Sequence, residues 1–178
     1  MERVVGPTNY NDLSNLQVLF LNGPIQGAPD WQKEAITIIH DLDCLKSIWI
    51  ANPRRDYLPG TFIPEEQYRW ERVHREIARN KGVNLFWLAK EVSHHPERAY
   101  AQATRFELAE SLGWYLKRSL KYPSKMVLGV EKGFSGERYI KFAIDEDYSN
   151  DYDRIQAHSS LEETCKAAVD EIIQMVED

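Results

Sequence analysis

The sequence has no long hydrophobic run and little cysteine. No stretch approaches the roughly 18 uninterrupted apolar residues that a membrane-spanning helix needs, so we expect no membrane contact. The N-terminus lacks the charged-then-apolar layout of a secretion signal. Cys44 and Cys165 are the two cysteines and lie far apart. This pattern predicts ordinary buried or half-buried thiols, no metal site and a cytoplasmic location.

The sequence also lacks an excess of basic residues. It has 22 lysines and arginines against 28 aspartates and glutamates, for a formal net charge of −6. This balance argues against a nucleic-acid polymer as partner, but it leaves room for a local basic pocket that holds one phosphate.

The remaining composition is that of a globular protein. The chain has 178 residues, 43% of them hydrophobic and 28% charged, with no internal repeat and no low-complexity linker. We therefore expect one domain over residues 1–178. Within it, residues 1–15 are predicted to be a loosely packed N-terminal extension.

Apolar runs alternate with segments of helical periodicity. Strands are predicted at Leu16–Asn22, Ser47–Asn52, Val83–Ala89, Lys125–Glu131 and Arg154–His158. Helices are predicted from Trp31 to about Leu42, at Pro64–Asn80, at about Tyr100–Lys117 and after Ser160. Ser160 and Glu163 have the spacing of a capping box at the start of the last helix. The acidic segment Asp145–Asp153 is expected to be a solvated loop.

Strands of nearly continuous apolar character that alternate with helices indicate an α/β protein. Its parallel sheet of about five strands would be covered by helices on both faces, as a three-layer sandwich. Such sheets bind ligands at the carboxyl ends of their strands. The loops at these ends are Asn22–Ala28, Asn52–Tyr57, Ala89–Tyr100 and Glu131–Gly136. We therefore predict a small-molecule pocket that these loops build.

The first of these loops has the sequence NGPIQG, residues 22–27. Its glycine spacing does not match the dinucleotide-binding pattern, and no Lys-Ser/Thr pair follows as in a Walker loop. Two interpretations stay open. The loop is a tight strand-to-helix turn, or its glycines let a ligand approach the backbone closely.

Polar residues after the second strand and on the second helix are further candidates. Arg54 and Arg55 follow the end of the second strand. Three interpretations stay open: their guanidinium groups bind a phosphate or carboxylate of a ligand, pair with a carboxylate of the protein itself, or are solvated. On the helix, Gln67, Glu71 and His74 share one face, and Trp70, Val73 and Ile77 form a neighbouring apolar face. The polar face is either solvated or supplies Glu71 to a ligand.

The third loop contains His94 and His95. No carboxylate or cysteine stands at ligand spacing from this pair, and Pro96 breaks any helix. We therefore interpret residues 89–100 as a substrate-facing loop or lid and not as a metal site.

The helix after this loop carries a carboxylate close to a strand end. Its core face is predicted to contain Phe106, Ala109, Leu112 and Leu116. Glu107 is expected near the N-terminus of the helix, where a carboxylate is stabilised as the anion and is available as a nucleophile. Glu110, one turn further on, is the better candidate for a plain surface residue.

Several segments together resemble a known family. They are VLFLNGPI, WQKEAI, NPRRD, EEQYRWE, LFWL, TRFELAESLG, KMVLGVEKGFSGERYI and SLEETCKAAVDEI, in this order from about residue 17 to the C-terminus. In order and spacing they resemble the nucleoside 2-deoxyribosyltransferase superfamily, particularly its bacterial deoxyribosyltransferase-like branch.

The resemblance implies a flavodoxin-like fold and a double-displacement mechanism without a cofactor. Glu107 matches the catalytic glutamate, which attacks the sugar anomeric carbon of a nucleoside, expels the base and forms a glycosyl-enzyme ester. A second base, or water, then resolves the ester. The resemblance also implies a homo-oligomer and a role in nucleoside salvage. The residues expected at the substrate are Asn22, Gly23, Pro24, Gln26, Trp31, Arg54, Arg55, Trp70, Glu71 and Thr104.

Three departures from the family pattern keep other functions open. Phe20 stands where several transferases have a tyrosine that hydrogen-bonds the nucleophile, Gly82 where many members have an aspartate near the base, and Ala109 where a glycine is usual. One alternative is an N-glycosidase of nucleoside 5′-monophosphates in which Arg54 or Arg55 holds the phosphate. Another is a nucleotide-binding or sensing module that has lost turnover.

Overall fold

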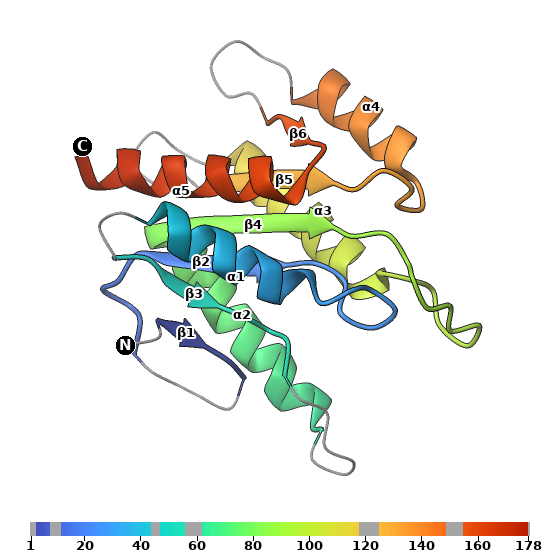
Figure 1. The fold of residues 1–178 in the computed structure, drawn as a ribbon, viewed down its shortest axis with the longest axis horizontal. Helices are drawn as coiled ribbons and strands as arrows, with labels where there is room; N and C mark the ends of the chain where they lie inside the picture. The colour runs from blue at the N-terminus through green and yellow to red at the C-terminus, as the bar shows by residue number, and fades with distance from the viewer. Residues whose placement is uncertain are drawn as a thin grey trace.

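The computed structural model describes residues 3–7, 12–43, 47–55, 62–117, 125–148 and 155–177. In these residues one parallel sheet has the strand order β1-β3-β2-β4-β5-β6 (Figure 1). The strands are β1 (Val4–Val5), β2 (Val18–Asn22), β3 (Trp49–Ala51), β4 (Gly82–Leu88), β5 (Lys125–Val130) and β6 (Ala157–His158). The helices are α1 (Trp31–Leu42), α2 (Pro64–Lys81), α3 (Gln102–Lys117), α4 (Glu137–Asp147) and α5 (Leu161–Glu177).

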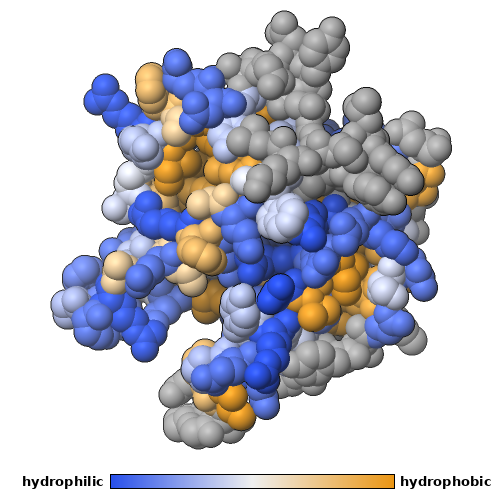
Figure 2. Space-filling view, turned by 180° about the vertical axis from the view of Figure 1, so that it is seen from behind, coloured by the Kyte–Doolittle hydropathy of each residue, from blue (hydrophilic) through white to orange (hydrophobic). Residues whose placement is uncertain are grey.

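This architecture confirms the predicted flavodoxin-like α/β sandwich. The order β3-β2-β4-β5-β6 is the 2-1-3-4-5 order of doubly wound sheets, and β1 extends it at one edge, so the described sheet has six strands and not about five. Helices α1 and α5 cover one face, and α2 and α3 lie behind the other (Figure 1). Figure 2 shows the molecule from the side of α2 and α3, where hydrophilic residues occupy the centre between hydrophobic patches.

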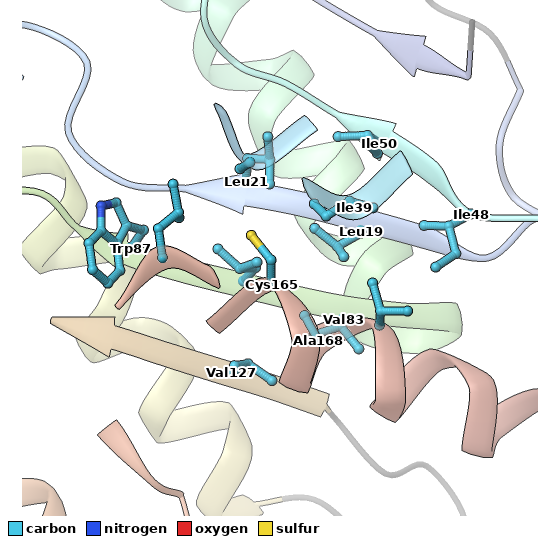
Figure 3. Packing of buried hydrophobic residues seen from close by; sticks show 14 of the residues in the cluster. Leu19, Leu21, Ile39, Ile48, Ile50, Val83, Trp87, Val127, Cys165 and Ala168 are labelled. Carbon is cyan, nitrogen blue, oxygen red and sulfur yellow. The ribbon is translucent and has the colours of Figure 1, made fainter. Parts of the chain in front are cut away.

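The strands form because apolar side chains point to both faces. Leu19 and Leu21 of β2 belong to the core beneath α1 and α5, which Figure 3 shows with Cys165 of α5 at its centre. Val18 and Phe20 alternate with them and pack toward α2. Every residue of β2 and β4 is buried, as continuous apolar strands between two helical layers require.

Two helix termini follow their sequence signals. Pro64 is at the first turn of α2, and Glu65 and Glu66 follow it in the same turn. At α5 the backbone N–H of Glu163 donates to Ser160 Oγ at 3.2 Å, so the predicted capping box is confirmed.

The N-terminal segment and the region after β5 differ from the prediction. The described part of residues 1–15 is not loosely packed, since Val4–Val5 pairs with β3 and both Val5 and Leu13 are about 1% exposed. Helix α4 was not predicted, and Asp145–Asp147 belong to it instead of to a loop. The rest of that acidic segment, from residue 149, lies outside the described residues, as does Cys44.

The core face of α3 was also predicted wrongly. Phe106 is 71% exposed and Ala109 is exposed, whereas Thr104, Leu108 and Tyr115 are buried. Leu112 is partly buried, as expected, and the side chain of Leu116 lies outside the described residues. On α2, Val73 is 51% exposed instead of facing the core. No helix in the described ranges combines the length and the apolar character that crossing a bilayer requires.

Candidate functional site

The sheet topology defines one edge for ligand binding. The chain passes from β2 to β3 on one side of β2 and then returns to β4 on the other side. In doubly wound sheets the ligand lies outside the carboxyl ends of the strands at this switch point. Here that point lies between Asn22, the last residue of β2, and the loop that follows Leu88 of β4.

The first loop is packed onto Trp31. A Cβ atom at Gly23 would lie 2.4 Å from the Trp87 carbonyl oxygen and 2.5 Å from the Trp31 ring, so only glycine fits at this position. The indole N–H of Trp31 donates to the Pro24 carbonyl at 2.8 Å. Trp31 is 2% exposed and therefore supports the loop from beneath instead of walling an open pocket. The tight-turn interpretation accounts for Gly23.

Arg54 supports the same loop. Its Nε donates to Gln32 Oε1 at 2.9 Å, one Nη donates to the Pro29 carbonyl at 2.9 Å, and Asp30 forms an ion pair with it at 3.1 Å. These contacts engage the Arg54 guanidinium in a structural role, with partners from the protein itself. Arg55 differs, because its guanidinium lies 4.7 Å from the Phe62 ring centroid and its buried Nη2 has no hydrogen-bond partner among the described residues.

The lid, residues 89–100, is closed against the first loop. Gly27 has φ 78°, and its carbonyl accepts from the backbone N–H groups of Val92 at 2.8 Å and Ser93 at 3.1 Å. Arg98 donates to the exposed Gln26 side chain at 2.5 Å. The Tyr100 hydroxyl donates to the Ala89 carbonyl at 2.7 Å, which ties the two ends of the lid. Gln26 therefore contacts the lid in this closed arrangement.

A buried polar seam runs from the switch point toward α2. Asn22 and Asn84 share the face of the sheet that α2 covers, and Asn22 donates to Asn84 Oδ1 at 3.2 Å. Asn84 donates in turn to the Arg75 carbonyl at 3.1 Å. Asn22 is 1% and Asn84 5% exposed. The seam therefore connects the end of β2 with the helix that carries Arg75.

Glu107 lies where this seam meets α3. Its carboxylate is 3.7 Å from Arg75 Nη1, which also pairs with Glu110 at 3.3 Å. The side chain of Glu107 is 17% exposed, whereas that of Glu110 is 47% exposed. Of these two glutamates on α3, Glu107 is therefore the less exposed and Glu110 is the surface residue, as the sequence predicted.

The pKa of Glu107 is raised, whereas the sequence predicted a carboxylate that the helix N-terminus stabilises as the anion. Glu107 is in the second turn of α3, beyond the first turn where the helix dipole acts, so the helix N-terminus does not hold it as an anion. Burial raises the pKa of Glu107 to about 7, while Arg75 opposes this rise and the nearby charges of Glu71 and Glu110 add to it. At neutral pH Glu107 is therefore about half protonated.

Glu71 is a second partly buried carboxyl group, on the facing helix α2. Its Oε1 accepts from Gln67 Nε2 at 2.7 Å, and the same Nε2 donates to the Pro53 carbonyl at 3.0 Å. Burial raises the pKa of Glu71, against the opposing effects of Gln67 and Arg75. Two carboxyl groups with raised pKa values therefore flank one arginine, an arrangement typical of acid–base and nucleophilic sites.

Trp70 belongs to the packing behind this site. It is fully buried, its ring stacks on His74 at 4.1 Å, and the Phe20 ring lies 6.0 Å away. The His74 Nδ1 is 2.8 Å from the Trp70 carbonyl, and burial lowers the pKa of His74, which favours the neutral ring. Trp70 therefore supports α2 and does not present a face to a ligand.

Thr104 is buried one turn before Glu107 on α3, at 4% exposure. The preceding Ala101 has φ 56°, an uncommon conformation for a residue with a side chain, where α3 begins. Such strain is often found at functional sites, and it fixes the direction in which α3 carries Thr104 and Glu107 away from the lid.

The structure thus brings together Asn22, Glu71 and Glu107 on the α2 and α3 side of the switch point, and Thr104 is buried on α3 one turn before Glu107. Trp31, Arg54 and Trp70 support this region from within, and Gln26 lies at the lid. The sequence reasoning missed Arg75 and Asn84. Asn84 had a signal, since it is the polar residue inside the apolar run GVNLFWL. Arg75 had none, because its importance depends on the packing of α2 against α3.

Two polar atoms at this site have no partner within the described part of the chain. They are Asn22 Oδ1 and Gln67 Oε1, both buried. Buried polar atoms are normally satisfied, so unpaired ones near two carboxyl groups point to a small polar ligand or to water.

The residues described give no group of three or more histidine, cysteine or carboxylate side chains arranged to hold a metal ion. In the lid, His94 Nδ1 lies 2.9 Å from Glu91, and both are on the outer surface of the loop.

A comparison of the chain with models of known protein families finds no match, and a comparison with curated proteins finds none either.

Proposed function

We propose that the protein cleaves the N-glycosidic bond of (2′-deoxy)nucleosides through a glycosyl-enzyme ester on Glu107 and transfers the sugar to another base. The observation that carries the proposal is the position of Glu107. This mostly buried carboxylate lies 3.7 Å from Arg75 and is joined through Arg75 and Asn84 to the end of β2. The motif resemblance to the deoxyribosyltransferase superfamily supports the same assignment for Glu107.

In the first step the ionised carboxylate of Glu107 attacks the anomeric carbon. A carbon–oxygen bond forms, the bond to the base nitrogen breaks with its electron pair, and the base takes a proton. Glu71 supplies that proton, since burial keeps part of its population protonated at higher pH than a solvated glutamate. In the second step a nitrogen of another base attacks the anomeric carbon, the carbon–oxygen bond to Glu107 breaks with its electron pair, and the incoming base gives its proton to Glu71, which restores both carboxyl groups.

Arg75 has two effects on this chemistry. Its guanidinium favours the ionised form of Glu107, which burial otherwise disfavours. It also stabilises the carboxylate as a leaving group when the ester breaks. A poorly solvated carboxylate beside one cation is more reactive toward an oxocarbenium-like centre than a carboxylate in water.

The lid controls access to the site. The contacts of Val92 and Ser93 with Gly27 close it over the first loop. Substrate entry requires this loop to move, and its return excludes water, which favours transfer to a base over hydrolysis.

Arg55 favours one alternative, an N-glycosidase of nucleoside 5′-monophosphates. Its buried Nη2 lacks a partner in the described residues, so it is the better phosphate ligand of the predicted pair, since Arg54 is engaged with the first loop. The other alternative is a binding or sensing module. It is favoured by the partial protonation of Glu107, and by Phe20 and Gly82, which replace the tyrosine and the aspartate of the family pattern.

One assay separates the three functions. The protein is incubated with a 2′-deoxynucleoside, with and without a second free base, and then with the matching 5′-monophosphate. Base exchange supports the transferase, and base release only from the monophosphate supports the hydrolase. Binding without turnover supports the sensing module. Full turnover by Glu107→Ala would contradict the assignment of the nucleophile.

A homo-oligomer is part of the same proposal. Phe106 is 71% exposed on α3 and Val73 is 51% exposed on α2, so each of these helices presents a large apolar side chain to solvent. Burial of these side chains against a second copy is consistent with the predicted oligomer.

A further inference from the structure

A cavity of about 260 Å³ lies between α2, α3 and the amino-terminal half of β5. Its lining includes Arg72, Arg75, Arg79, Ser111, Trp114 and Lys125, but not the first loop or the lid. It therefore lies apart from the first loop and the lid, and it borders the switch-point site through Arg75, which pairs with Glu107, and through Asn84, which accepts a hydrogen bond from Asn22.

The charge of this cavity is concentrated on one helix face. Arg72, Arg75 and Arg79 stand at i, i+3 and i+7 of α2, so the three side chains project from the same side of the helix. Lys125 of β5 also lines the cavity, but its ammonium pairs with Glu171 of α5 at 2.6 Å. Two carboxylates, Glu76 and Glu110, also line the cavity. The lining is thus net positive in a protein whose formal net charge is −6.

The carboxylates that line the cavity do not fully neutralise its arginines, so the arginines can still attract an anion. Glu76 is 57% and Glu110 47% exposed, so their ion pairs with Arg79 and Arg75 are in high dielectric and contribute little. Arg72 is exposed and has no ion-pair partner in the described residues. An anion with several oxygens competes with such pairs, because it accepts charge-assisted hydrogen bonds from more than one guanidinium at once.

Arg75 gives the strongest indication of a ligand. It is 9% exposed, lines the cavity, and its buried Nε has no hydrogen-bond partner in the described part of the chain. A buried guanidinium N–H without an acceptor is costly, and a bound oxyanion would satisfy it.

The size and the aromatic wall restrict the ligand. The cavity is larger than the roughly 30 Å³ that one water molecule occupies in the liquid. It is smaller than the pockets of drug-sized ligands, which have volumes of about 300–1,000 Å³. Trp114 is 48% exposed at the cavity, and the Arg79 guanidinium stacks 4.4 Å from its ring centroid, which orients the donors of Arg79. A small phosphate-bearing molecule fits this combination better than a whole dinucleotide.

We propose that the cavity between α2 and α3 is a binding site for a small phosphate-bearing anion, such as pyrophosphate or a sugar phosphate. Arg72, Arg75 and Arg79 hold the phosphate oxygens, and Trp114 borders the rest of the ligand. The site does not require the glycosidase activity to exist. Through Arg75, however, an anion bound here draws positive charge away from Glu107.

Calorimetry with pyrophosphate, ribose 5-phosphate and ribose tests the site on the full-length protein. We expect the two phosphates to bind and ribose not to bind, and we expect affinity to fall with added salt. Ligand binding should also change the tryptophan fluorescence, and Trp114→Phe should remove that change. A deoxynucleoside 5′-monophosphate in the same titration shows whether the site accepts the phosphate of a nucleotide or only a smaller ligand.

Arg72→Gln and Arg69→Gln form a matched pair of variants. Both arginines are exposed on α2 three residues apart, but only Arg72 lines the cavity. Loss of one charge-assisted contact should weaken pyrophosphate binding about tenfold in Arg72→Gln, and Arg69→Gln should stay within about twofold of the parent. Equal weakening in both variants, or no binding heat with either phosphate, would overturn the proposal. Because binding is measured without turnover, a protein that binds pyrophosphate but leaves nucleosides intact would contradict only the proposed function.

Discussion

The buried carboxyl group of Glu107 should cost the protein stability when it ionises. Its pKa in an unfolded chain is near the ordinary value of 4.5, and in the folded protein burial raises it to about 7. Between these values the folded state binds more protons than the unfolded state, so stability decreases as pH rises through this window. Glu107→Gln keeps the shape of the side chain and removes the titration.

The size of the effect follows from the pKa difference. A difference between 4.5 and about 7 corresponds to about 3 kcal/mol at 1.36 kcal/mol per pKa unit, which is an upper value for a group that is not fully buried. We therefore expect Glu107→Gln and the parent to differ little near pH 4. At pH 8 the variant should be more stable by about 1–3 kcal/mol.

Urea unfolding of both proteins at several pH values between 4 and 8 measures this difference. All other titrating groups are shared, so they largely cancel in the comparison. Glu110→Gln is the control, because Glu110 pairs with the same Arg75 but is 47% exposed, and its removal should change stability by less than about 1 kcal/mol at every pH. A parent protein that is as stable as Glu107→Gln at pH 8, or more stable, would refute the reasoning.

Two further predictions concern activity and the lid. Because Glu107 must be ionised and Glu71 must keep its proton, the pH dependence of kcat/KM should contain a rise with a midpoint near the pKa of Glu107, about 7, and a profile without any rise would contradict Glu107 as the nucleophile. Gly27→Ala should lower the free energy of unfolding by about 1–2 kcal/mol, since φ is 78° at this position. A Cβ there would also meet the Ser93 carbonyl at 2.7 Å, so faster backbone amide exchange in residues 89–100 should accompany it, and unchanged exchange would argue against the clamp.

The parallel sheet was predictable because its strands are continuous apolar runs. Each residue of VLFLN and GVNLFWL is buried between two helical layers, and this leaves a clear signal in the sequence. Helix α4 left little signal, since Ile144 is its one fully buried residue and charged residues surround it. Strand β1 has two residues, too few for any periodicity.

The error in α3 has a similar cause. Its core-facing positions are Thr104, Leu108 and Tyr115, which are buried, and Leu112, which is partly buried; they have helical spacing but a polar residue at the start and a tyrosine at the end. The large apolar Phe106 suggested the opposite face. The sequence still identified Glu110, and not Glu107, as the more exposed glutamate of α3, whereas it did not identify the residues that surround Glu107.

The surroundings of Glu107 depend on how α2 is placed against the sheet. Arg75 and Asn84 lie nine residues apart, on either side of the turn from α2 into β4, and they join through a backbone carbonyl. No local pattern predicts that contact. Glu107 lies beyond the first turn of α3, and burial raises its pKa, which only the folded packing reveals.

The central claim is a covalent sugar on Glu107, and rapid-quench intact-mass analysis tests it directly. The protein is mixed with a 2′-deoxynucleoside and quenched at short times, and the mass and the modified peptide are determined. We predict a species heavier by one deoxyribosyl group, located at Glu107 and absent from Glu107→Gln. Base release without such an adduct in the parent, or an unchanged adduct in Glu107→Gln, would contradict the account.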